Sequence, residues 1–569
     1  NVYSDYLCCG VWHQTSANNF DHDSGNDIVT DADGNVYVTG TYDLYTHFQG
    51  TAVPSSLANA DEAMFIAKYS ACGNLDWVAY SENSNSAETT TGKGVVLDEV
   101  EEVVYVTGAY VGTNNLFYNA GGGGTPVPLT AASPAIGMYV ASFNMSDGSV
   151  NWVHDYDNAG SELDPVAIAI DPDQELFVAG TLDNGSTTKA YLFKMTAIPS
   201  QSTDYFTTGS DNSSATDIAA RGVGQRLYIT GNYAGSAMQM GNSNSVPNNG
   251  VKDGFLASFN DQGTWANFAA MTHSGSYSGG WSEVNAVTVD PYGFPCVVGN
   301  FNGKMDGYFV WPLQLNGALG TGTPYEMFVA RVDPTGAWGA GSWIKASTGT
   351  SYTYGRDISH DGTDLIALGA YDKSISFAPS VSLTHSNSGT QHMFLSRFEL
   401  ATGNSMWALE AALDEQNPTR LSVDDLGYIF STGSYTGQMD MQNGDVPLLT
   451  NTSSGTGGNC FVVRADATIG DFFFVDPDFN ATGIDEEHEF GFTVYPNPSN
   501  GLAYVRLPET ESTSTLKVYN ELQQLVKVVQ LNADASEAFI NLSNESAGVY
   551  FIQMENNGSI ETTKLILSR

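Results

Sequence analysis

A phrase of about sixteen residues recurs seven times along this chain, and it constrains the fold more than any other feature. Its clearest copy, residues 27–42, reads DIVTDADGNVYVTGTY. In each copy a glycine is followed two positions later by an aromatic residue, or by leucine in the third copy. A motif that returns at regular intervals predicts a modular repeat architecture. The seven glycines are Gly40, Gly108, Gly180, Gly231, Gly299, Gly369 and Gly433.

The phrase has the chemistry of a β-hairpin. Ile28 and the run 36–38 are strand formers. Asp33-Gly34-Asn35 between them is typical of a tight turn, because glycine and asparagine tolerate a positive φ. A glycine after the second strand predicts a bulge or a close approach of another backbone.

A second phrase follows each hairpin. It consists of a small or sulfur-containing residue, an aromatic residue and an apolar run, as in Met64-Phe-Ile-Ala-Lys-Tyr69. A turn and a strand rich in aromatic residues come next, so each unit supplies about four antiparallel strands. One such sheet cannot bury both faces alone, whereas seven stacked around an axis can. The sequence therefore predicts an all-β chain that begins with a seven-bladed β-propeller.

The propeller is expected to span residues 1–479. A strand near residues 10–14, around Val11-Trp12-His13, resembles the aromatic strand but precedes the first blade. We expect it to pair into the last blade and close the ring, with 472–475 as the rival segment. The third unit is short by about one hairpin, since the step from its glycine to the next is 51 residues.

The two phrases resemble the bacterial β-propeller repeats known as SBBP repeats. That pattern runs Asp-x-x-Gly-Asn-x-Tyr-Val-Thr-Gly and then Asp-x-Phe-[Ile/Val]-Ala-Lys; residues 31–40 and 61–68 match it best. The resemblance covers roughly residues 20–475. It implies the propeller fold and leaves function open, because propellers support many functions.

The pattern changes after Phe479. Residues 480–490 are polar and acidic and are expected to form a linker. From 491 to 569, seven short strands in fewer than 90 residues predict a small Ig-like β-sandwich.

Four motifs occur in order in this last segment: Tyr495-Pro-Asn-Pro498 with Gly501, Leu516-Lys-Val-Tyr-Asn520, Ser546-Ala-Gly-Val-Tyr-Phe551 and Thr563-Lys-Leu-Ile-Leu567. Together they resemble the type A C-terminal sorting domain of cargo proteins of the type IX secretion system in Bacteroidetes. The departure is Gln523-Gln524, where the family usually has Gly-Gln. The resemblance implies passage through the periplasm, recognition of residues 491–569 by the type IX translocon and an outer-membrane shuttle protein, and a secreted or cell-surface location. The sorting-signal residues are Tyr495, Pro496, Asn497, Pro498, Gly501, Gly548, Tyr550 and Lys564.

Charge excludes some partners. The chain has 20 Lys and Arg against 63 Asp and Glu, a net charge of −43. Nucleic acid is not an expected partner, since phosphate binding needs clustered basic residues. No apolar run is long enough for a transmembrane helix. The acidity is explained by solubility outside the cell, with calcium binding as the alternative.

Five cysteines leave the disulfide pattern open. Cys296 lies in a strand and is expected to be a small buried apolar residue. Cys8, Cys9, Cys72 and Cys460 lie near strand ends. One disulfide from Cys8 or Cys9 to Cys72 or Cys460 would suit an oxidising compartment.

No catalytic motif is present, so we expect no enzyme and no cofactor. Two acidic segments, 31–35 and 171–175, resemble fragments of calcium loops but lack the glutamate that ends a complete loop. Hairpin turns explain both segments, and Ca²⁺ stays an open alternative.

Aromatic residues in the long loops are the candidate ligand-binding residues. Tyr308, Phe309, Trp311 and Tyr325 of the fifth unit could stack on sugar rings, or they could pack against their own blade. The leading hypothesis is a non-enzymatic binding module for a glycan or a protein partner. The alternatives are a polysaccharide-degrading enzyme on a propeller scaffold and a structural surface-layer or adhesin component.

Overall fold

The structure is a computed structural model, and it divides the chain into two compact units, residues 1–479 and 480–569. It describes residues 13–15, most of 23–466 and most of 493–567. Gaps of four or more residues within these spans lie at 55–61, 84–87, 120–124, 130–135, 157–160, 197–203, 208–211, 221–225, 261–264, 274–279, 309–313, 317–324, 335–340, 386–389, 441–448, 451–457, 507–513, 521–524 and 532–536.

The fold is all-β, without a helix among the described residues. Each repeat of the N-terminal unit forms an antiparallel sheet whose strands follow chain order. The first sheet contains β2 (Ser24–Thr30), β3 (Val36–Tyr42), β6 (Ala63–Tyr69) and β7 (Leu75–Glu82). The second contains β9 (Gly94–Asp98), β10 (Val103–Val111), β13 (Gly137–Asn144) and β14 (Val150–Tyr156), and β8 (Thr89–Thr90) pairs with the end of β10. The third contains β15 (Glu162–Ile170), β16 (Glu175–Asp183), β17 (Thr188–Thr196) and β18 (Asp204–Thr207).

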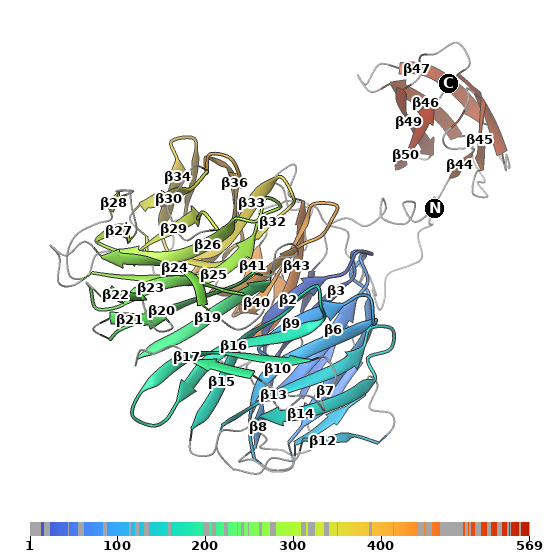
Figure 1. Cartoon of the computed structure of the whole chain (residues 1–569). Helices are drawn as coiled ribbons and strands as arrows, with labels where there is room; N and C mark the ends of the chain where they lie inside the picture. The colour runs from blue at the N-terminus through green and yellow to red at the C-terminus, as the bar shows by residue number, and fades with distance from the viewer. Residues whose placement is uncertain are drawn as a thin grey trace. The chain divides into compact units, whose positions relative to one another are not determined.

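The remaining repeats follow the same plan (Figure 1). The fourth sheet contains β19 (Ser213–Ala220), β20 (Arg226–Tyr233), β23 (Asp253–Asn260) and β24 (Trp265–His273). The fifth contains β25 (Trp281–Val289), β26 (Pro295–Asn302), β29 (Glu326–Arg331) and β30 (Trp343–Ala346). The sixth contains β32 (Thr353–His360), β33 (Asp364–Tyr371), β36 (His392–Glu399) and β37 (Ser405–Glu410). The seventh contains β39 (Gln416–Val423), β40 (Tyr428–Tyr435), β43 (Asn459–Asp466) and β1 (His13–Thr15).

The seventh sheet combines both ends of the N-terminal unit. Its fourth strand is β1, which pairs antiparallel with β43 so that His13 lies opposite Val463. β1 overlaps the strand expected near residues 10–14 at His13 and Gln14, and residues 10–12 lie outside the described residues. The rival segment, 472–475, lies outside the described residues.

Extra hairpins connect the second and third strands of most sheets. The hairpin β11 (Asn115–Tyr118)–β12 (Val127–Leu129) extends the first sheet through β7, and β27 (Lys304–Tyr308)–β28 (Gln314–Asn316) extends the fourth through β24. The third sheet has no such hairpin, because β16 and β17 join through the short turn 184–187, which explains the short third repeat. The other hairpins are β4 (Tyr45–Phe48)–β5 (Thr51–Pro54), β21 (Ala237–Met240)–β22 (Asn244–Pro247), β34 (Ser374–Ala378)–β35 (Val381–Thr384) with β31 (Thr348–Gly349), and β41 (Gln438–Asp440)–β42 (Leu449–Thr450) with β38 (Ala412–Leu413).

The recurring glycines sit where three strands crowd together. A Cβ atom on Gly369 would lie 2.4 Å from the Tyr354 carbonyl oxygen of the first strand and 2.4 Å from the Phe394 ring of the third. All seven glycines make this pair of close approaches, and the aromatic ring always comes from the second phrase of the repeat. The predicted close backbone approach is confirmed. It also explains why the two phrases occur together.

Aspartate residues fix the hairpin turns. The Asp31 carboxylate accepts hydrogen bonds from the backbone NH groups of Asp33 (3.0 Å) and Asn35 (2.8 Å). Asp171, Asp290 and Asp424 make the same pair of bonds to the residues two and four positions later. Such turns supply the local signal that starts each hairpin.

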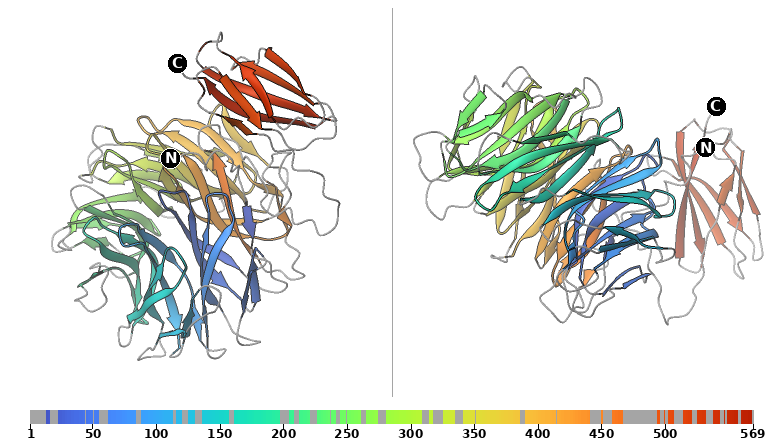
Figure 2. Two further views of the ribbon diagram at one scale, coloured as in Figure 1. Left: turned by 90° about the vertical axis from the view of Figure 1, so that its right-hand side faces the viewer. Right: turned by 60° about the horizontal axis from the view of Figure 1, so that its bottom comes forward.

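The first strands of successive sheets contact one another in the cyclic order β2, β9, β15, β19, β25, β32, β39 and back to β2. Seven clusters of buried apolar side chains, counted over the described residues, each lie between two successive sheets, including the seventh and the first. Figure 2 shows the sheets following one another from blue β2 to orange β43. The core of this unit is therefore divided among the sheet interfaces.

Polar bonds cross the same interfaces. Asp27 accepts a hydrogen bond from the Val95 NH of the next sheet at 2.8 Å. At the periphery, the Trp77 indole donates to the Met145 carbonyl oxygen of the next sheet at 3.1 Å. These bonds fix the position of each sheet against its neighbour.

The C-terminal unit has two antiparallel sheets around one apolar core. One contains β44 (Thr493–Tyr495), β45 (Leu502–Arg506) and β48 (Glu537–Asn541). The other, in spatial order, contains β47 (Leu525–Leu531), β46 (Ser514–Asn520), β49 (Gly548–Asn556) and β50 (Ser559–Leu567). Val505 from the first sheet and Leu516 and Ile552 from the second, all fully buried, belong to this shared core.

The cysteines differ in state. Cys72 is in a disulfide whose partner lies outside the described residues. Cys460 is a buried thiol whose pKa is raised to about 12, first by burial, so the alternative that placed it in a disulfide is wrong. The reason is its place in the core between the first and seventh sheets. Cys296 is also a buried thiol, as expected.

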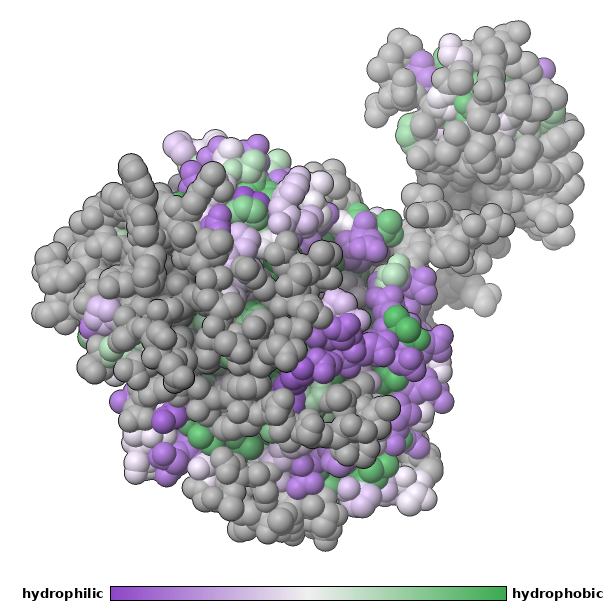
Figure 3. All heavy atoms as spheres, in the orientation of Figure 1, coloured by the Kyte–Doolittle hydropathy of each residue, from purple (hydrophilic) through white to green (hydrophobic). Residues whose placement is uncertain are grey.

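The surface in Figure 3 is mainly hydrophilic where it is described, with hydrophobic residues in small separate groups. No helix among the described residues has the length and apolar character needed to cross a membrane.

Candidate functional site

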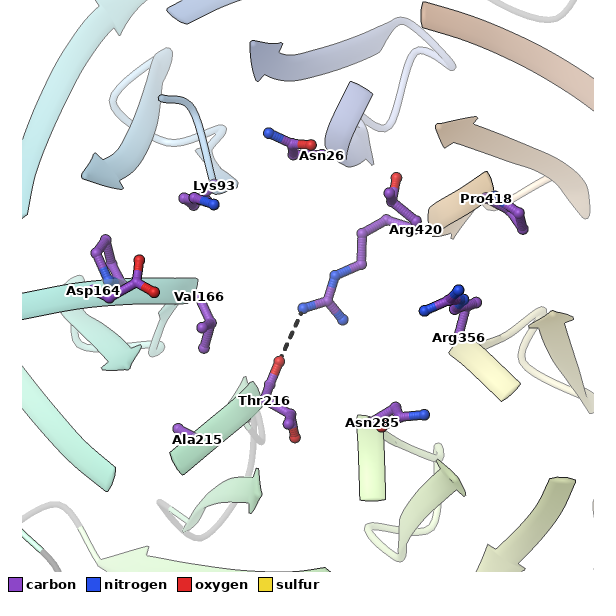
Figure 4. Close-up of a pocket in the computed structure, with 12 residues that line it drawn as sticks. Asn26, Lys93, Asp164, Val166, Ala215, Thr216, Asn285, Arg356, Pro418 and Arg420 are labelled. Carbon is purple, nitrogen blue, oxygen red and sulfur yellow. Dashed lines mark hydrogen bonds between the residues drawn. The ribbon is translucent and has the colours of Figure 1, made fainter. Parts of the chain in front are cut away.

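A cavity of about 380 Å³ lies where the first strands of the N-terminal unit converge (Figure 4). Its position follows from the bulges: in six sheets the register of the first strand shifts by one residue opposite or next to the recurring glycine. The residue at each shift lines the cavity. Its twelve lining residues are Asn26, Lys93, Asp164, Pro165, Val166, Ala215, Thr216, Asn285, Arg356, Pro418, Thr419 and Arg420.

Arg420 extends its guanidinium group into this cavity in Figure 4. It forms ion pairs with Asp217 of β19 at 3.1 Å and with Asp357 of β32 at 3.3 Å. It also donates to the Thr216 carbonyl oxygen at 3.3 Å. One side chain of the seventh sheet thus connects the fourth and sixth sheets across the cavity.

Three other repeats have an aspartate at the position equivalent to Arg420, directly after the bulge: Asp27, Asp217 and Asp357. Burial is the main cause that raises the pKa of Asp27, to about 7, while the nearby Arg420 opposes this rise. Burial also raises the pKa values of Asp217 and Asp357, again against the effect of Arg420. Each of these aspartates accepts a hydrogen bond from a backbone NH group of the next sheet, at 2.7–2.8 Å.

Two further basic residues line the cavity without an ion pair within 4.0 Å among the described residues: Lys93 and Arg356. The Arg356 Nε is buried and has no hydrogen-bond partner. Burial lowers the pKa of Arg356, and its guanidinium carbon lies 5.1 Å from the centre of the Tyr354 ring. Lys93 lowers the pKa of Asp164, although burial raises that pKa more.

An aromatic cluster adjoins Arg356. Tyr325 is half-buried and directly precedes β29. It lies edge-on to Trp281, Tyr352 and Tyr354, with ring centres 4.7, 5.0 and 5.6 Å away. All four residues are only partly buried. Lys252, which is ion-paired with Glu283, lies 6.0 Å from the Trp281 ring centre. The cluster joins the fifth and sixth sheets at the end where their first strands begin.

Of the predicted ligand-binding residues, the structure thus places Tyr325 in a described aromatic site. Tyr308 is described only as the last residue of β27, which pairs with β24 of the fourth sheet. Phe309 and Trp311 lie outside the described residues. Sequence reasoning did not select Trp281, Tyr352 and Tyr354.

A signal for them was present in the repeat alignment. Trp281 and Tyr352 stand at equivalent positions before their bulges, where the third, fourth and seventh repeats have Glu162, Asn212 and Glu415. Aromatic residues at a position that is otherwise polar indicate a local function or a local contact.

The two suspected calcium segments are turns. Asp31 and Asp171 use their carboxylates to accept backbone NH groups, as described above. Within the described part of the chain, no group of three or more His, Cys, Asp or Glu side chains is placed to hold a metal ion.

In the C-terminal unit, three of the motif residues lie on the strands of the larger sheet and one lies on the smaller sheet. Gly548 begins β49, and the buried Tyr550 donates its hydroxyl to the Ser546 carbonyl oxygen at 2.7 Å. Lys564 lies on β50 opposite Phe551. Tyr495 ends β44. Pro496, Asn497, Pro498 and Gly501 lie outside the described residues.

Residues 493–568 match the family described as secretion system C-terminal sorting domain. This match indicates a cargo of the type IX secretion system, exported to the cell surface or the extracellular space. No curated protein matches the chain.

Solved structures resemble the chain only weakly. A polysaccharide lyase, Uly1, has a TM-score of 0.39 and 11% identity over 78% of this chain and 90% of its own. The full extracellular region of plexin A4 has a TM-score of 0.40 and 8% identity over 97% of this chain and 67% of its own. A copper-bound fungal alcohol oxidase of the AA5 family has a TM-score of 0.32 and 9% identity over 97% and 98%. Scores this low support no argument about activity.

Proposed function

We propose that this chain is a non-enzymatic surface or secreted binding protein, in which a seven-bladed β-propeller binds a glycan and an Ig-like C-terminal domain directs export. The export route rests on the sorting-domain match. The propeller and its ligand rest on the contacts of the N-terminal unit.

Closure of the seven sheets into a ring is supported by contacts between the seventh sheet and the first. β2 contacts β39, and a core cluster combines Ile28 and Val38 with Phe430 and Val462. β1 adds the N-terminus to the seventh sheet. A strand from the start of a propeller that completes its last blade removes a free edge, which stabilises the ring.

The Ig-like assignment of the C-terminal domain is supported by its two antiparallel sheets, which share one apolar core. We propose that the type IX translocon and an outer-membrane shuttle protein recognise residues 491–569. The test compares the full chain in two bacterial strains, one with a working type IX translocon and one without. We expect the chain outside the first strain and in the periplasm of the second. Equal export from both strains would refute this route.

Glycan binding rests on one observation, the partly exposed aromatic cluster around Tyr325 beside the cavity. Aromatic faces present apolar area together with polar edges, which suits sugar rings. Burial is the first cause that raises the pKa of Tyr354, so this phenol is protonated at neutral pH. A protonated tyrosine can donate a hydrogen bond to a ligand hydroxyl.

The test is a glycan array with the full chain and three variants. Trp281→Ala and Tyr325→Ala remove cluster rings, whereas Tyr292→Ala removes a ring that is 71% exposed in a turn. We expect saturable binding by the parent and by Tyr292→Ala, and a loss of about tenfold or more in the cluster variants. Absence of binding by the parent, or equal binding by all variants, would refute the glycan proposal and leave a protein partner or a structural role.

A further inference from the structure

The cavity is basic in a strongly acidic protein. Asp and Glu outnumber Lys and Arg by 63 to 20 in the whole chain, whereas three basic residues and one acidic residue line the cavity. Arg420 is compensated by its two aspartates. Arg356 and Lys93 have no ion pair within 4.0 Å among the described residues, although Glu283 and Asp164 act on them electrostatically from a greater distance. Their charges are therefore the ones that a ligand can approach.

Arg356 has the geometry of an incomplete site. Its Nε is buried without a hydrogen-bond partner, which is unfavourable for the protein alone, and an ion pair at the other guanidinium nitrogens would offset part of this cost. Its contact with the Tyr354 ring holds the guanidinium group at the cavity wall. In Figure 4 the nitrogen atoms of Arg356 face the cavity, and Lys93 lies on the opposite side of the cavity. A planar guanidinium group with free donors matches the two oxygens of a carboxylate.

Arg356 connects the aromatic cluster to the wall of the cavity. Arg356 lines the cavity and also contacts Tyr354, whose ring packs on Tyr325. A ligand that stacks a sugar ring on the cluster could thus place an attached anionic group beside Arg356. The volume of about 380 Å³ lies within the usual range for small-ligand pockets.

We propose that this cavity binds the carboxylate of a hexuronic acid, the acidic end of the glycan that the aromatic cluster holds. Arg356 receives the carboxylate, and Lys93 contributes charge from the opposite wall. Asp164 accepts hydrogen bonds from sugar hydroxyls. This assignment rests on the proposed glycan-binding function and adds its ligand class.

Isothermal titration calorimetry of the full chain tests the assignment with four probes: glucuronate, glucose, acetate and an oligomer that ends in glucuronate. We expect glucuronate to bind at least about tenfold more tightly than glucose, because only the acid offers an ion pair to Arg356. The affinity for acetate shows how much the carboxylate contributes without a sugar ring. The affinity for the oligomer shows how much the added contacts at the aromatic cluster contribute. Binding of glucuronate should weaken as salt rises.

Three variants locate the site. Arg356→Gln should weaken glucuronate binding about tenfold or more, and Arg356→Lys should restore part of it, since lysine keeps the charge but loses the fork. Lys345→Gln removes a basic residue of β30 that does not line the cavity and should bind as the parent does. Thermal unfolding shows whether each variant is folded. If Arg356→Gln does not fold, Arg356→Lys alone provides the test of the site.

The outcomes separate the two proposals. Equal affinity for glucuronate and glucose, or unchanged glucuronate binding in both Arg356 variants, would overturn the carboxylate site. If neutral glycans still bind and their binding depends on Trp281, the glycan-binding function stands without the carboxylate site. If acetate and glucuronate bind equally, the cavity is a general carboxylate site and the sugar assignment falls.

Discussion

The Thr419 hydroxyl donates a hydrogen bond to the Gly25 carbonyl oxygen at 2.6 Å, although the two residues are 394 positions apart. It joins the first strand of the seventh sheet to the first strand of the first. Equivalent bonds cross other interfaces, such as Asn26 to Gly92 (2.8 Å) and Asn285 to Gly355 (2.7 Å). The contact between the two ends of the repeat array therefore uses the same chemistry as the contacts within it.

Thr419→Val should destabilise the protein by about 1–2 kcal/mol, because valine keeps the shape but leaves the Gly25 carbonyl oxygen without this donor. Urea unfolding measures the change in the free energy of unfolding. Thr348→Val, on the exposed strand β31, is the matched control and should change it by less than about 0.5 kcal/mol. Equal effects of the two substitutions would argue against a structural role for the Thr419 bond.

Gly369→Ala should cost about 3 kcal/mol, since the new methyl group would lie 2.4 Å from both Phe394 and the Tyr354 carbonyl oxygen. Gly362→Ala is the comparison: nothing lies within 4 Å of its Cβ position, but its φ is +86°. That backbone strain alone should cost about 1 kcal/mol. Thermal unfolding of both variants should rank Gly369→Ala as clearly less stable; the reverse order would contradict the crowding at the repeat glycines.

Asp27 should make stability depend on pH. Its pKa is about 7 in the folded protein against an ordinary value of 3.8. Between these values the folded state holds more protons than the unfolded state, so stability falls as the pH rises from about 4 to 7. Asp27→Asn cannot titrate, and its melting temperature should fall less over this window than that of the parent. An equal fall of the melting temperature in both proteins would contradict this explanation.

Arg420→Gln should destabilise the protein by about 3 kcal/mol at pH 8, because it leaves the Asp217 and Asp357 carboxylates without their partner. The loss should be smaller at pH 5, since burial raises both pKa values and protonation removes the uncompensated charge. Adding Asp357→Asn should recover part of the stability at pH 8. Urea unfolding at both pH values is the measurement, and a loss that does not change with pH would contradict this explanation.

Local chemistry made much of the fold predictable. The Asp-x-x-Gly-Asn turns, the alternating strands and the repeat glycine predicted the hairpins, and β2–β3 and β25–β26 lie where those phrases occur. Seven short strands were expected from 491 to 569, and seven strands, β44 to β50, are described there. These features depend on residues that are close in sequence, and for this reason they can be predicted from a single sequence.

The candidate site was much less predictable. Tyr325 was selected from the sequence, but Trp281 and Tyr354 were not. These two residues pack on Tyr325, yet they lie 44 residues before it and 29 residues after it in the chain. Arg356 and Arg420 looked like ordinary strand residues, because their burial and charge partners are set by other sheets.

By itself, the sequence determined the repeating hairpins, the need for a glycine in each, and the export domain, since each depends on a contiguous motif. Only the tertiary structure decided which side chains meet. In six of the seven sheets a bulge in the first strand turns one residue toward a shared cavity, and Arg356 is one of these residues. Lys93, Arg356 and Arg420, distant in the chain, thereby line the same cavity. The pKa of Asp27 follows from the same assembly, because burial and the charge of Arg420 act on it only after distant sheets pack together.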